Sequence, residues 1–376
     1  MSKLLWEPRP DQVAQTNMHR FMRFVNQRHG TAFAHYDELY RWSIEAIPDF
    51  WAAAWDFLEI RASRAGDQVV DDPYKMPGAQ WFEGARLNFA ENLLRYRDAE
   101  TALIFKGEDR PVRRLTYSEL YKAVARVAAA LKACGVTAGD RVVGFMPNMP
   151  EAIVAMLAAT SMGAVWSSCS PDFGIKGVLD RFGQIKPKVL FTANGYAFKG
   201  KTIDSLGRIA DILAQLPSIE KVVVVPYTEA SPDIGRVPHA VMYDDFAAGD
   251  GGELEFAQLP FDHPLYIMYS SGTTGLPKCM VQSAGGILLH QMKELVLHTD
   301  LRENDGLAYF TTCGWMMWNW LTSALAVGAR VVLMDGSPFH PRTPRLFDIA
   351  QDEALAVLGT SAKWIAMAEK RGLCPR

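Results

Sequence analysis

The stretch YSSGTTGLPK, residues 269–278, follows directly on the apolar run LYIMY (265–269) and indicates both a fold and a ligand. Its Ser and Thr residues supply hydroxyl donors, its glycines let the backbone approach an anion, and Lys278 adds a positive charge. In α/β proteins, ligands bind beyond the carboxyl ends of strands, which is where this loop begins. The loop therefore suits the phosphates of a nucleotide, although the same residue types also build plain surface turns.

The loop is not the phosphate loop of kinases and P-loop NTPases. That motif has four residues between its first Gly and a Gly-Lys pair, whereas here Gly272 is followed by Gly275 and then by Leu-Pro-Lys. A kinase-like or NTPase-like phosphate binder is therefore disfavoured.

Apolar strands and amphipathic helices alternate on both sides of the loop. Thr116 and Glu119 form a capping box that starts a helix, and Gly135 ends it. The pattern then predicts strands at 141–146, 163–168, 188–192, 221–225, 307–311, 330–334 and near 357, and helices at 151–162, 175–184, 203–215, 285–297, 318–327, 344–353 and 361–371. Strands that are apolar throughout and are separated by helices imply parallel sheets covered on both faces.

The expected fold class is α/β, with two stacked αβαβα units and mainly parallel sheets. Residues 1–100 are aromatic-rich and irregular and are expected to form a helical lead-in. Residues 101–225 are expected to form the first unit, 226–262 a connecting region rich in Asp, Gly and Pro, and 263–376 an incomplete second unit.

Composition excludes several classes of protein. The chain has 376 residues, of which 49% are hydrophobic and 22% charged, so it is neither disordered nor fibrous. A net charge of −3 provides no polybasic surface, and we expect no nucleic-acid or membrane partner. The five cysteines are odd in number and widely spaced, without a CxxC pair, which favours a reducing, cytoplasmic setting.

The stretch 269–278 resembles the signature loop of the adenylate-forming enzymes, the superfamily of acyl-CoA synthetases, luciferases and peptide-synthetase adenylation domains. DHPLYIMY, LTYSELYKAVARVAAALKACGVTAGDRV and NMPEAIVAMLAATSMGAVWSS also resemble that superfamily, in the same order, so that the resemblance covers about 100–376. WFEGARLNFAENLL (81–94) resembles the lead-in of the acetyl-CoA synthetase group, and CGWMMWNW within 310–341 resembles its acetoacetate-activating members.

This resemblance implies an ATP-dependent acid–thiol ligase. A carboxylate attacks the α-phosphate of ATP, pyrophosphate leaves, and the thiolate of CoA then displaces AMP from the acyl-adenylate. ATP, Mg²⁺ and CoA are the implied cofactor and co-substrates, acetoacetate is the implied acid, and ketone-body and lipid metabolism are the implied setting. The residues implied to grip the β and γ phosphates are Ser270, Ser271, Gly272, Thr273, Thr274, Gly275 and Lys278.

Two further groups of residues are implied to contact the other substrates. Trp315, Met316, Met317 and Asn319 are implied to line the acyl pocket, with Asn319 as an amide donor to the β-keto oxygen; a helix start packed in the core is the alternative, and we favour it for Trp318 and Trp320. The CoA candidates are Lys199, Lys201, Ser361 and Ala362, although the two lysines are equally compatible with a solvated surface pair.

Other functional parts of the superfamily lie downstream of the matched region. These parts are the adenine and ribose contacts, the magnesium-binding glutamate, and the small C-terminal domain with its catalytic lysine. We therefore expect a truncated N-terminal portion of a longer synthetase, with no catalytic residue and no metal ligand of its own, inactive when alone. The alternatives are an acetyl-CoA or other short-chain synthetase and a non-catalytic nucleotide- or acyl-binding module; the oligomeric state stays open.

Overall fold

The structure is a computed structural model that describes residues 4, 6–270 and 275–373. Its largest sheet, the first sheet, has seven strands in the order β13 (Ala240–Met242), β12 (Lys221–Val225), β9 (Val189–Ala193), β7 (Arg141–Phe145), β8 (Val165–Cys169), β15 (Pro264–Ser270) and β16 (Lys278–Ser283). The second sheet has five strands in the order β19 (Leu355–Gly359), β17 (Gly306–Tyr309), β18 (Arg330–Met334), β5 (Thr101–Lys106) and β6 (Arg113–Thr116). Neighbouring strands are parallel except in the pairs β15–β16 and β5–β6.

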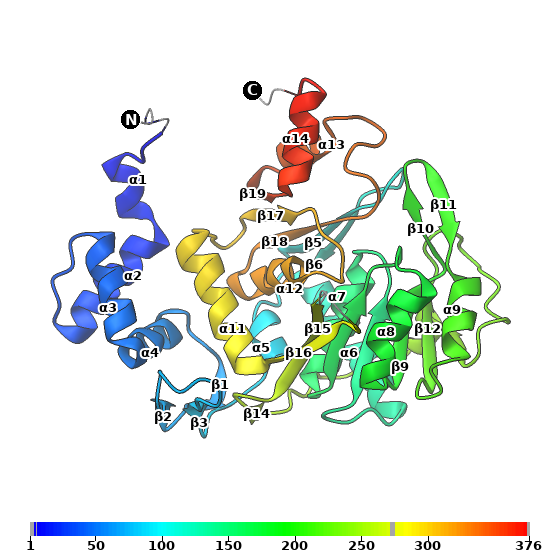
Figure 1. Ribbon diagram of the computed structural model, residues 1–376, viewed down its shortest axis with the longest axis horizontal. Helices are drawn as coiled ribbons and strands as arrows, with labels where there is room; N and C mark the ends of the chain where they lie inside the picture. Colours follow the sequence, from blue (N-terminus) through cyan, green and yellow to red (C-terminus); the bar gives the residue numbers. More distant parts are fainter. Residues whose placement is uncertain (1–3, 5, 271–274, 374–376) are drawn as a thin grey trace.

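Helices cover both faces of both sheets (Figure 1). The longer ones in the body are α6 (Tyr117–Ala133), α7 (Pro150–Ser161), α8 (Ile175–Ile185), α9 (Leu206–Leu213), α11 (Ala284–Lys293), α12 (Met316–Ser323), α13 (Arg345–Asp352) and α14 (Ala362–Lys370). Shorter elements are α5 (Phe89–Leu93), α10 (Tyr243–Phe246), a π-helical turn at Glu294–His298 and a 3₁₀ turn at Ala324–Val327. Most of the predicted elements are thereby confirmed to within a few residues, and β12 and β18 coincide with the predicted strands.

Three cores define five layers. One core lies between the two sheets and contains side chains of α6, α7, α11 and α12. A second joins α8 and α9 to the outer face of the first sheet, and a third joins α13 and α14 to the outer face of the second. The α/β class with mainly parallel sheets is therefore confirmed. The layers form a single αβαβα stack, with one central helical layer that both sheets share.

Helix α7 lies in the central layer and is buried on all sides. Every one of its residues is buried, because it is covered on all sides, and its sequence is accordingly apolar around its whole circumference. Its two buried hydroxyls are satisfied within the helix, since Thr160 Oγ1 donates to Met156 O at 2.9 Å and Ser161 Oγ to Ala158 O at 2.8 Å.

The sheets do not follow the expected division of the chain. Strands β5 and β6, from the expected first unit, lie in the second sheet, and β15 and β16, from the expected second unit, lie in the first. The sequence pattern did not predict β16, which pairs antiparallel to β15, or the small hairpin β10 (Gly195–Phe198) and β11 (Lys201–Asp204). Both are partly exposed and mix polar with apolar residues, so they lack the continuous apolar run that identifies a buried parallel strand.

The lead-in is helical, with α1 (Pro10–Gln15), α2 (Asn17–His29), α3 (Tyr36–Glu45) and α4 (Ile47–Phe57) forming a lobe beside α11 (Figure 1). It has a small aromatic core of its own, to which Leu297 of the body contributes. Short strands follow: β2 (Gln68–Val70) with β3 (Trp81–Glu83), and β1 (Ala62–Arg64) and β14 (Leu259–Pro260) on either side of β4 (Arg86–Leu87). Among the described residues, no helix combines the length and apolarity that a membrane span needs.

A buried carboxylate fixes α13 to the second sheet. Glu353, directly after α13, is only 5% exposed and lies 2.8 Å from both Lys106 Nζ of β5 and Arg114 Nη2 of β6. Burial raises the pKa of Glu353, but the hydrogen bonds and charges of Lys106 and Arg114 outweigh it, so that the pKa lies below its ordinary value of 4.5.

This ion pair predicts an acid-sensitive stability. A carboxyl group whose pKa is lower in the folded state stabilises above its unfolded pKa, and this contribution is lost as the pH falls through the folded pKa. Glu353→Gln is therefore expected to reduce the free energy of unfolding at neutral pH and to make its decline below pH 4.5 shallower. Urea denaturation at several pH values measures both effects, with exposed Glu220→Gln as control; an unchanged pH profile for Glu353→Gln would contradict the prediction.

Candidate functional site

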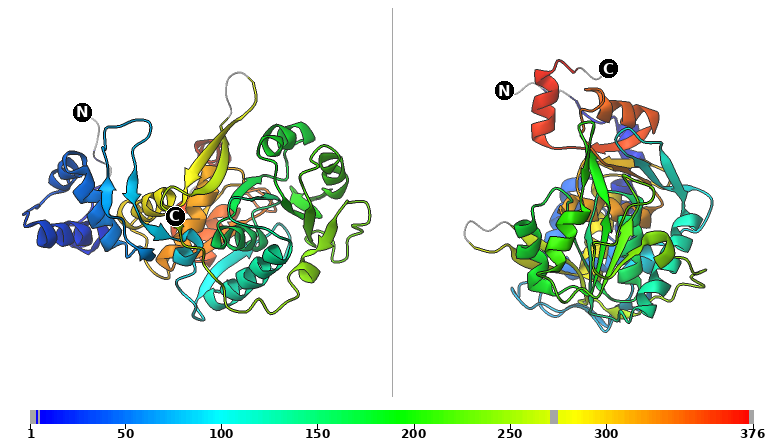
Figure 2. Two further views of the ribbon diagram at one scale, coloured as in Figure 1. Left: turned by 90° about the horizontal axis from the view of Figure 1, so that it is seen from below. Right: turned by 90° about the vertical axis from the view of Figure 1, so that its right-hand side faces the viewer.

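The candidate phosphate loop connects the two strands of a hairpin. Ser270, the last residue of β15, pairs directly with Lys278, the first residue of β16. Figure 2 shows these strands rising together from the body. Gly275 has a φ of +91°, which only glycine adopts without strain, and Lys278 is exposed. Ser271, Gly272, Thr273 and Thr274 lie outside the described residues.

Helix α8 supports the hairpin from its outer side. Gln184 Nε2 donates to the Pro277 carbonyl at 2.9 Å, just before β16. The Arg181 guanidinium lies 5.7 Å from the ring centre of Tyr269, within cation–π range. Burial raises the pKa of Tyr269, so its phenol stays neutral near pH 7. The loop end of the hairpin is thus held to an outer helix by one hydrogen bond and by this cation–π contact.

The four candidate acyl-pocket residues lie at the start of α12 and face different surroundings. Trp315 is 65% exposed and Met316 is 47% exposed, while Met317 is half-buried. Asn319 is 4% exposed, and its Nδ2 lies 3.3 Å from Met268 Sδ of β15. The structure therefore directs Asn319 toward the first sheet and leaves Trp315 and Met316 at the surface.

The alternative offered for the other two tryptophans is correct. Trp318 is fully buried, and its indole donates to Asn148 Oδ1 at 2.9 Å. Trp320 is partly buried and packs edge-on against Tyr309, with ring centres 6.3 Å apart. Both belong to the core between the sheets.

A small cavity lies where α12 approaches β8 and β15. Its volume is about 10 Å³, room for about one water molecule. Asn319 and Gly314 line it from the α12 side, and the strands contribute Trp166, Ser167, Ser168, Tyr266, Ile267 and Met268. The motif search missed these strand residues, because their proximity to Asn319 depends on the pairing of β8 with β15, for which the sequence holds no local signal.

The CoA candidates occupy two separate elements. Lys199 and Lys201 are exposed at the turn of the β10–β11 hairpin, and Lys199 Nζ lies 5.3 Å from the ring centre of Phe198. Ser361 is the N-cap of α14 and accepts a hydrogen bond from Trp364 N at 3.2 Å; Ala362 follows it and is exposed. Among the described residues, no hydrogen bond or ion pair connects the lysine hairpin with Ser361.

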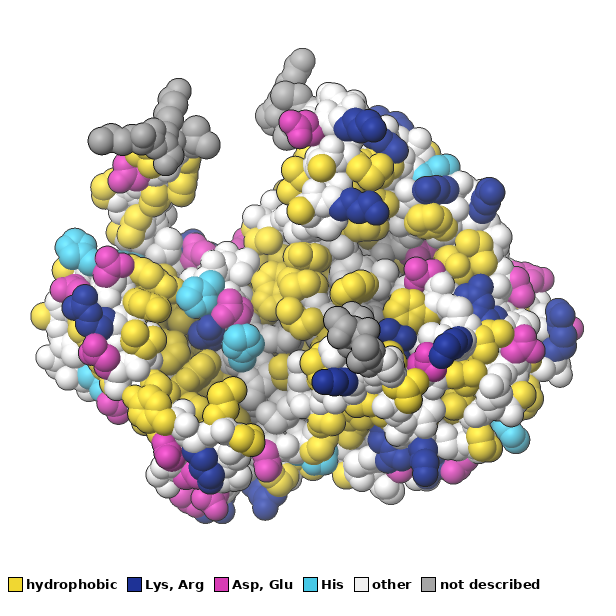
Figure 3. Space-filling model, viewed as in Figure 1, with side chains coloured by type: hydrophobic (Ala, Val, Ile, Leu, Met, Phe, Trp, Pro, Cys, Tyr) yellow, Lys and Arg dark blue, Asp and Glu magenta, His cyan; other side chains and the backbone are white. Residues whose placement is uncertain are grey.

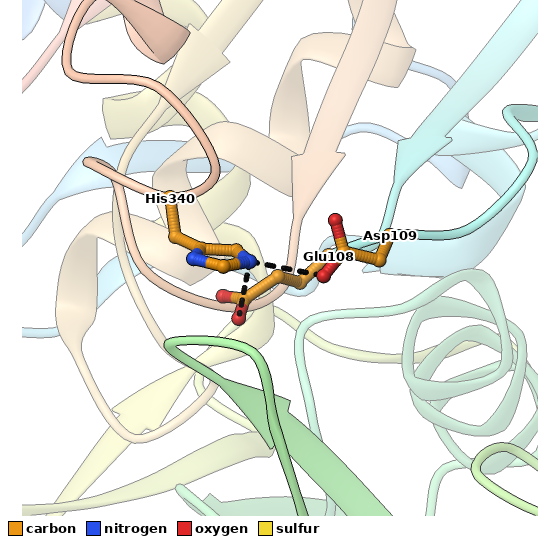
Figure 4. Close-up of side chains that lie close together, drawn as sticks. All are labelled: Glu108, Asp109 and His340. Carbon is orange, nitrogen blue, oxygen red and sulfur yellow. Dashed lines mark hydrogen bonds and ion pairs between the residues drawn. The ribbon is translucent and has the colours of Figure 1, made fainter.

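The lysine hairpin is held in place by Glu108, a residue that the motif search did not identify. Glu108 is 2% exposed, and its two carboxylate oxygens accept the backbone N–H groups of Gly200, in the hairpin turn, and of Ser337. Asp109 and His340 lie beside it, with His340 Nε2 at 2.9 Å from Asp109 Oδ2 and 3.7 Å from Glu108 Oε1 (Figure 4). In the part of the chain described, these are the three side chains close enough together to hold a metal ion. Both oxygens of Glu108 already have partners, so we assign the cluster a structural role.

Glu108→Gln tests this role. The amide NH₂ would face one of the two backbone donors, so the variant should lose about 1–3 kcal/mol of stability. Hydrogen exchange of residues 195–204 should also accelerate, because the hairpin loses its anchor. Asp109→Asn is the matched control, since that side chain is exposed and contacts only His340 of the cluster. Equal stability of the two variants would contradict the prediction.

Comparison with known sequences identifies the family. The profile of the AMP-binding enzymes matches residues 89–373, and that of the acetyl-coenzyme A synthetase N-terminus matches 36–93. The chain belongs to the AMP-binding enzyme family. The two profiles overlap over residues 89–93, which form α5, so most of the lead-in and the layered body match different profiles.

The chain is similar along its whole length to particular AMP-binding enzymes. It is 47% identical to the acetoacetyl-CoA synthetase of Gallus gallus, with 100% of the chain and 57% of that protein aligned. It is 39% identical to a malonamoyl-CoA synthetase of Penicillium aethiopicum, covering 100% of the chain and 55% of that protein. The structure of acetoacetyl-CoA synthetase from Streptomyces lividans superposes with a TM-score of 0.94 at 42% identity, covering 99% of the chain and 57% of that structure. The chain thus spans little more than half the length of these relatives.

Proposed function

We propose that the protein containing this chain joins acetoacetate to CoA at the expense of ATP, forming acetoacetyl-CoA, AMP and pyrophosphate through an acyl-adenylate. The observation that carries this proposal is the whole-length similarity to acetoacetyl-CoA synthetases, at 47% identity in sequence and a TM-score of 0.94 in structure. An acetyl-CoA or other short-chain synthetase and a non-catalytic binding module are the alternatives.

The acyl groups in the names of these relatives restrict the range of candidate acid substrates. Acetoacetyl and malonamoyl groups both carry a second carbonyl two carbons from the thioester carbonyl, and they differ in whether a methyl or an amino group follows it. We therefore propose a short acid with a carbonyl at the β position as the substrate class. Malonamate is the second candidate within that class.

In the proposed reaction, the substrate carboxylate attacks the α-phosphorus of ATP and the bond to the pyrophosphate oxygen breaks. Positioning and charge neutralisation dominate such a step, because the nucleophile is already ionised. We assign the grip on the β and γ phosphates to Ser270, Gly275, Lys278 and the intervening loop, with Mg²⁺ sharing the charge when bound. The CoA thiolate then attacks the acyl carbon and AMP leaves; Lys199, Lys201, Ser361 and Ala362 are proposed to contact CoA.

The surface and the cysteines support small-molecule substrates and a cytoplasmic setting. On the face shown in Figure 3, Lys and Arg side chains are interspersed with Asp and Glu, as suits a local anion site better than a polyanion. Cys134, Cys169, Cys279 and Cys313 are free. Burial raises the pKa of Cys169 to about 12 and also raises that of Cys313, so these thiols are unreactive.

Lys278→Ala in the full-length protein that contains this chain tests the phosphate grip. Loss of a charge-assisted contact to phosphate should lower the ATP–pyrophosphate exchange rate roughly tenfold to a hundredfold. Adding Thr274→Ala should lower it further. Lys122→Ala, an exposed lysine on α6, is the matched control. An unchanged exchange rate in the double variant would remove the loop from the mechanism.

Substitutions at Asn319 and Met317 test the acyl site. Asn319→Ala should reduce kcat/KM for acetoacetate relative to acetate by about tenfold, because an amide donor to the β-keto oxygen is lost. Met317→Ala should alter the same ratio through the shape of the site. Substrate profiling with Trp320→Phe as control measures both. Ratios equal to that of the unsubstituted protein would refute the acyl-site assignment.

A further inference from the structure

Trp166 of β8 has a buried hydrogen-bond donor without a partner. The residue is 1% exposed, and its indole Nε1 forms no hydrogen bond with any described residue. An indole nitrogen can only donate, and a buried donor without an acceptor carries the full cost of its lost hydration. Buried donors usually have a hydrogen-bond acceptor in folded proteins, so the missing acceptor of this indole N–H calls for an explanation.

Trp166 lines the same small cavity as Asn319. Ser167 and Ser168 also line it, and their hydroxyls already have acceptors, since Ser168 Oγ donates to Cys313 O at 2.6 Å and Ser167 Oγ to Ile267 O at 2.7 Å. Asn319 Nδ2 faces a thioether sulfur, Met268 Sδ, which is a weak acceptor. Of the residues that line this cavity, Trp166 and Asn319 therefore each carry an N–H donor that has no oxygen partner among the described residues.

The cavity has room for a single oxygen-sized group. The proposed acids carry one such group, the β-carbonyl oxygen. Met268 borders the cavity and is unbranched, so it can move to admit the atoms that follow the carbonyl carbon.

We propose that Trp166 determines acyl specificity by donating a hydrogen bond from its indole N–H to the β-carbonyl oxygen of the substrate. This proposal rests on the proposed function and adds a residue and a mechanism of selection to it. An acid of the same length without the carbonyl, such as butyrate, would fill the space and leave the indole N–H unpaired. Rejection of the wrong substrate by an unpaired polar group is stronger than selection by apolar contact alone.

The decisive measurement is the ratio of kcat/KM for acetoacetate to that for butyrate, made on the full-length protein that contains this chain. Trp166→Phe keeps an aromatic ring and removes the donor, so the ratio should fall on the order of tenfold to a hundredfold. Trp364→Phe is the matched control, because Trp364 is 5% exposed, its Nε1 is likewise buried without a partner, and it lies in the core on the outer face of the second sheet. The control should leave the ratio unchanged.

Each outcome decides a different point. A ratio retained in Trp166→Phe, or lowered equally in both variants, overturns the assignment of the donor while the proposed function stands. If the unsubstituted protein activates neither acid, the proposed function itself fails. Should Trp166→Phe fail to fold, benzothienylalanine at position 166 replaces the indole N–H by sulfur within nearly the same shape, and the same two ratios are compared.

Discussion

The packing of one helical layer between two sheets is the constraint on which the rest of this structure depends. Both sheets are mainly parallel, so both of their faces must be covered by helices. The central core contains residues of both sheets and of α6, α7, α11 and α12, and α7 is buried along its whole length. A change in the volume of a central helix would therefore be felt by both sheets, because packed interiors relax only partially. The shared layer also fixes where the carboxyl ends of the strands lie relative to each other.

Much of this fold could be predicted from the sequence. The apolar strands and amphipathic helices of the body were located to within a few residues, because burial on both faces leaves continuous apolar runs such as KVVVV at 221–225. The membership of strands in sheets was not predictable in the same way. Strands β5 and β15 each lie in the sheet opposite to that expected from chain order, and pairings between distant segments leave no periodic signal. The half-exposed strand β16 was missed for a related reason, since its alternation is weak and it directly follows the loop.

In the candidate site, too, the local part could be predicted from the sequence, and the part that depends on contacts between distant segments could not. The candidate phosphate loop is local, with all its residues within ten positions, so its composition and its place directly after an apolar strand predict an anion ligand. The proposed acyl site is assembled from α12, β8 and β15, and only its α12 segment has a recognisable pattern. The four acyl-pocket candidates at the start of α12 differ in their exposure, because successive side chains of a helix point to different faces. Trp315 and Met316 lie at the surface, whereas Asn319 lies against the first sheet.

Two kinds of recognition are therefore proposed to meet at β15. Its end carries the loop that is proposed to bind phosphate through backbone groups, hydroxyls and one lysine, and these elements would serve any nucleotide-activated acid equally well. Met268, two residues before that end, contacts Asn319 and borders the cavity that Trp166 also lines, where donors without an oxygen partner are proposed to distinguish one acid from another. The selective part of the site is the buried part, because an unpaired N–H group costs little in water and much in a closed cavity. Placing both on one strand ties the choice of acid to the position of the phosphates, since a shift of β15 would move the loop and the cavity wall together.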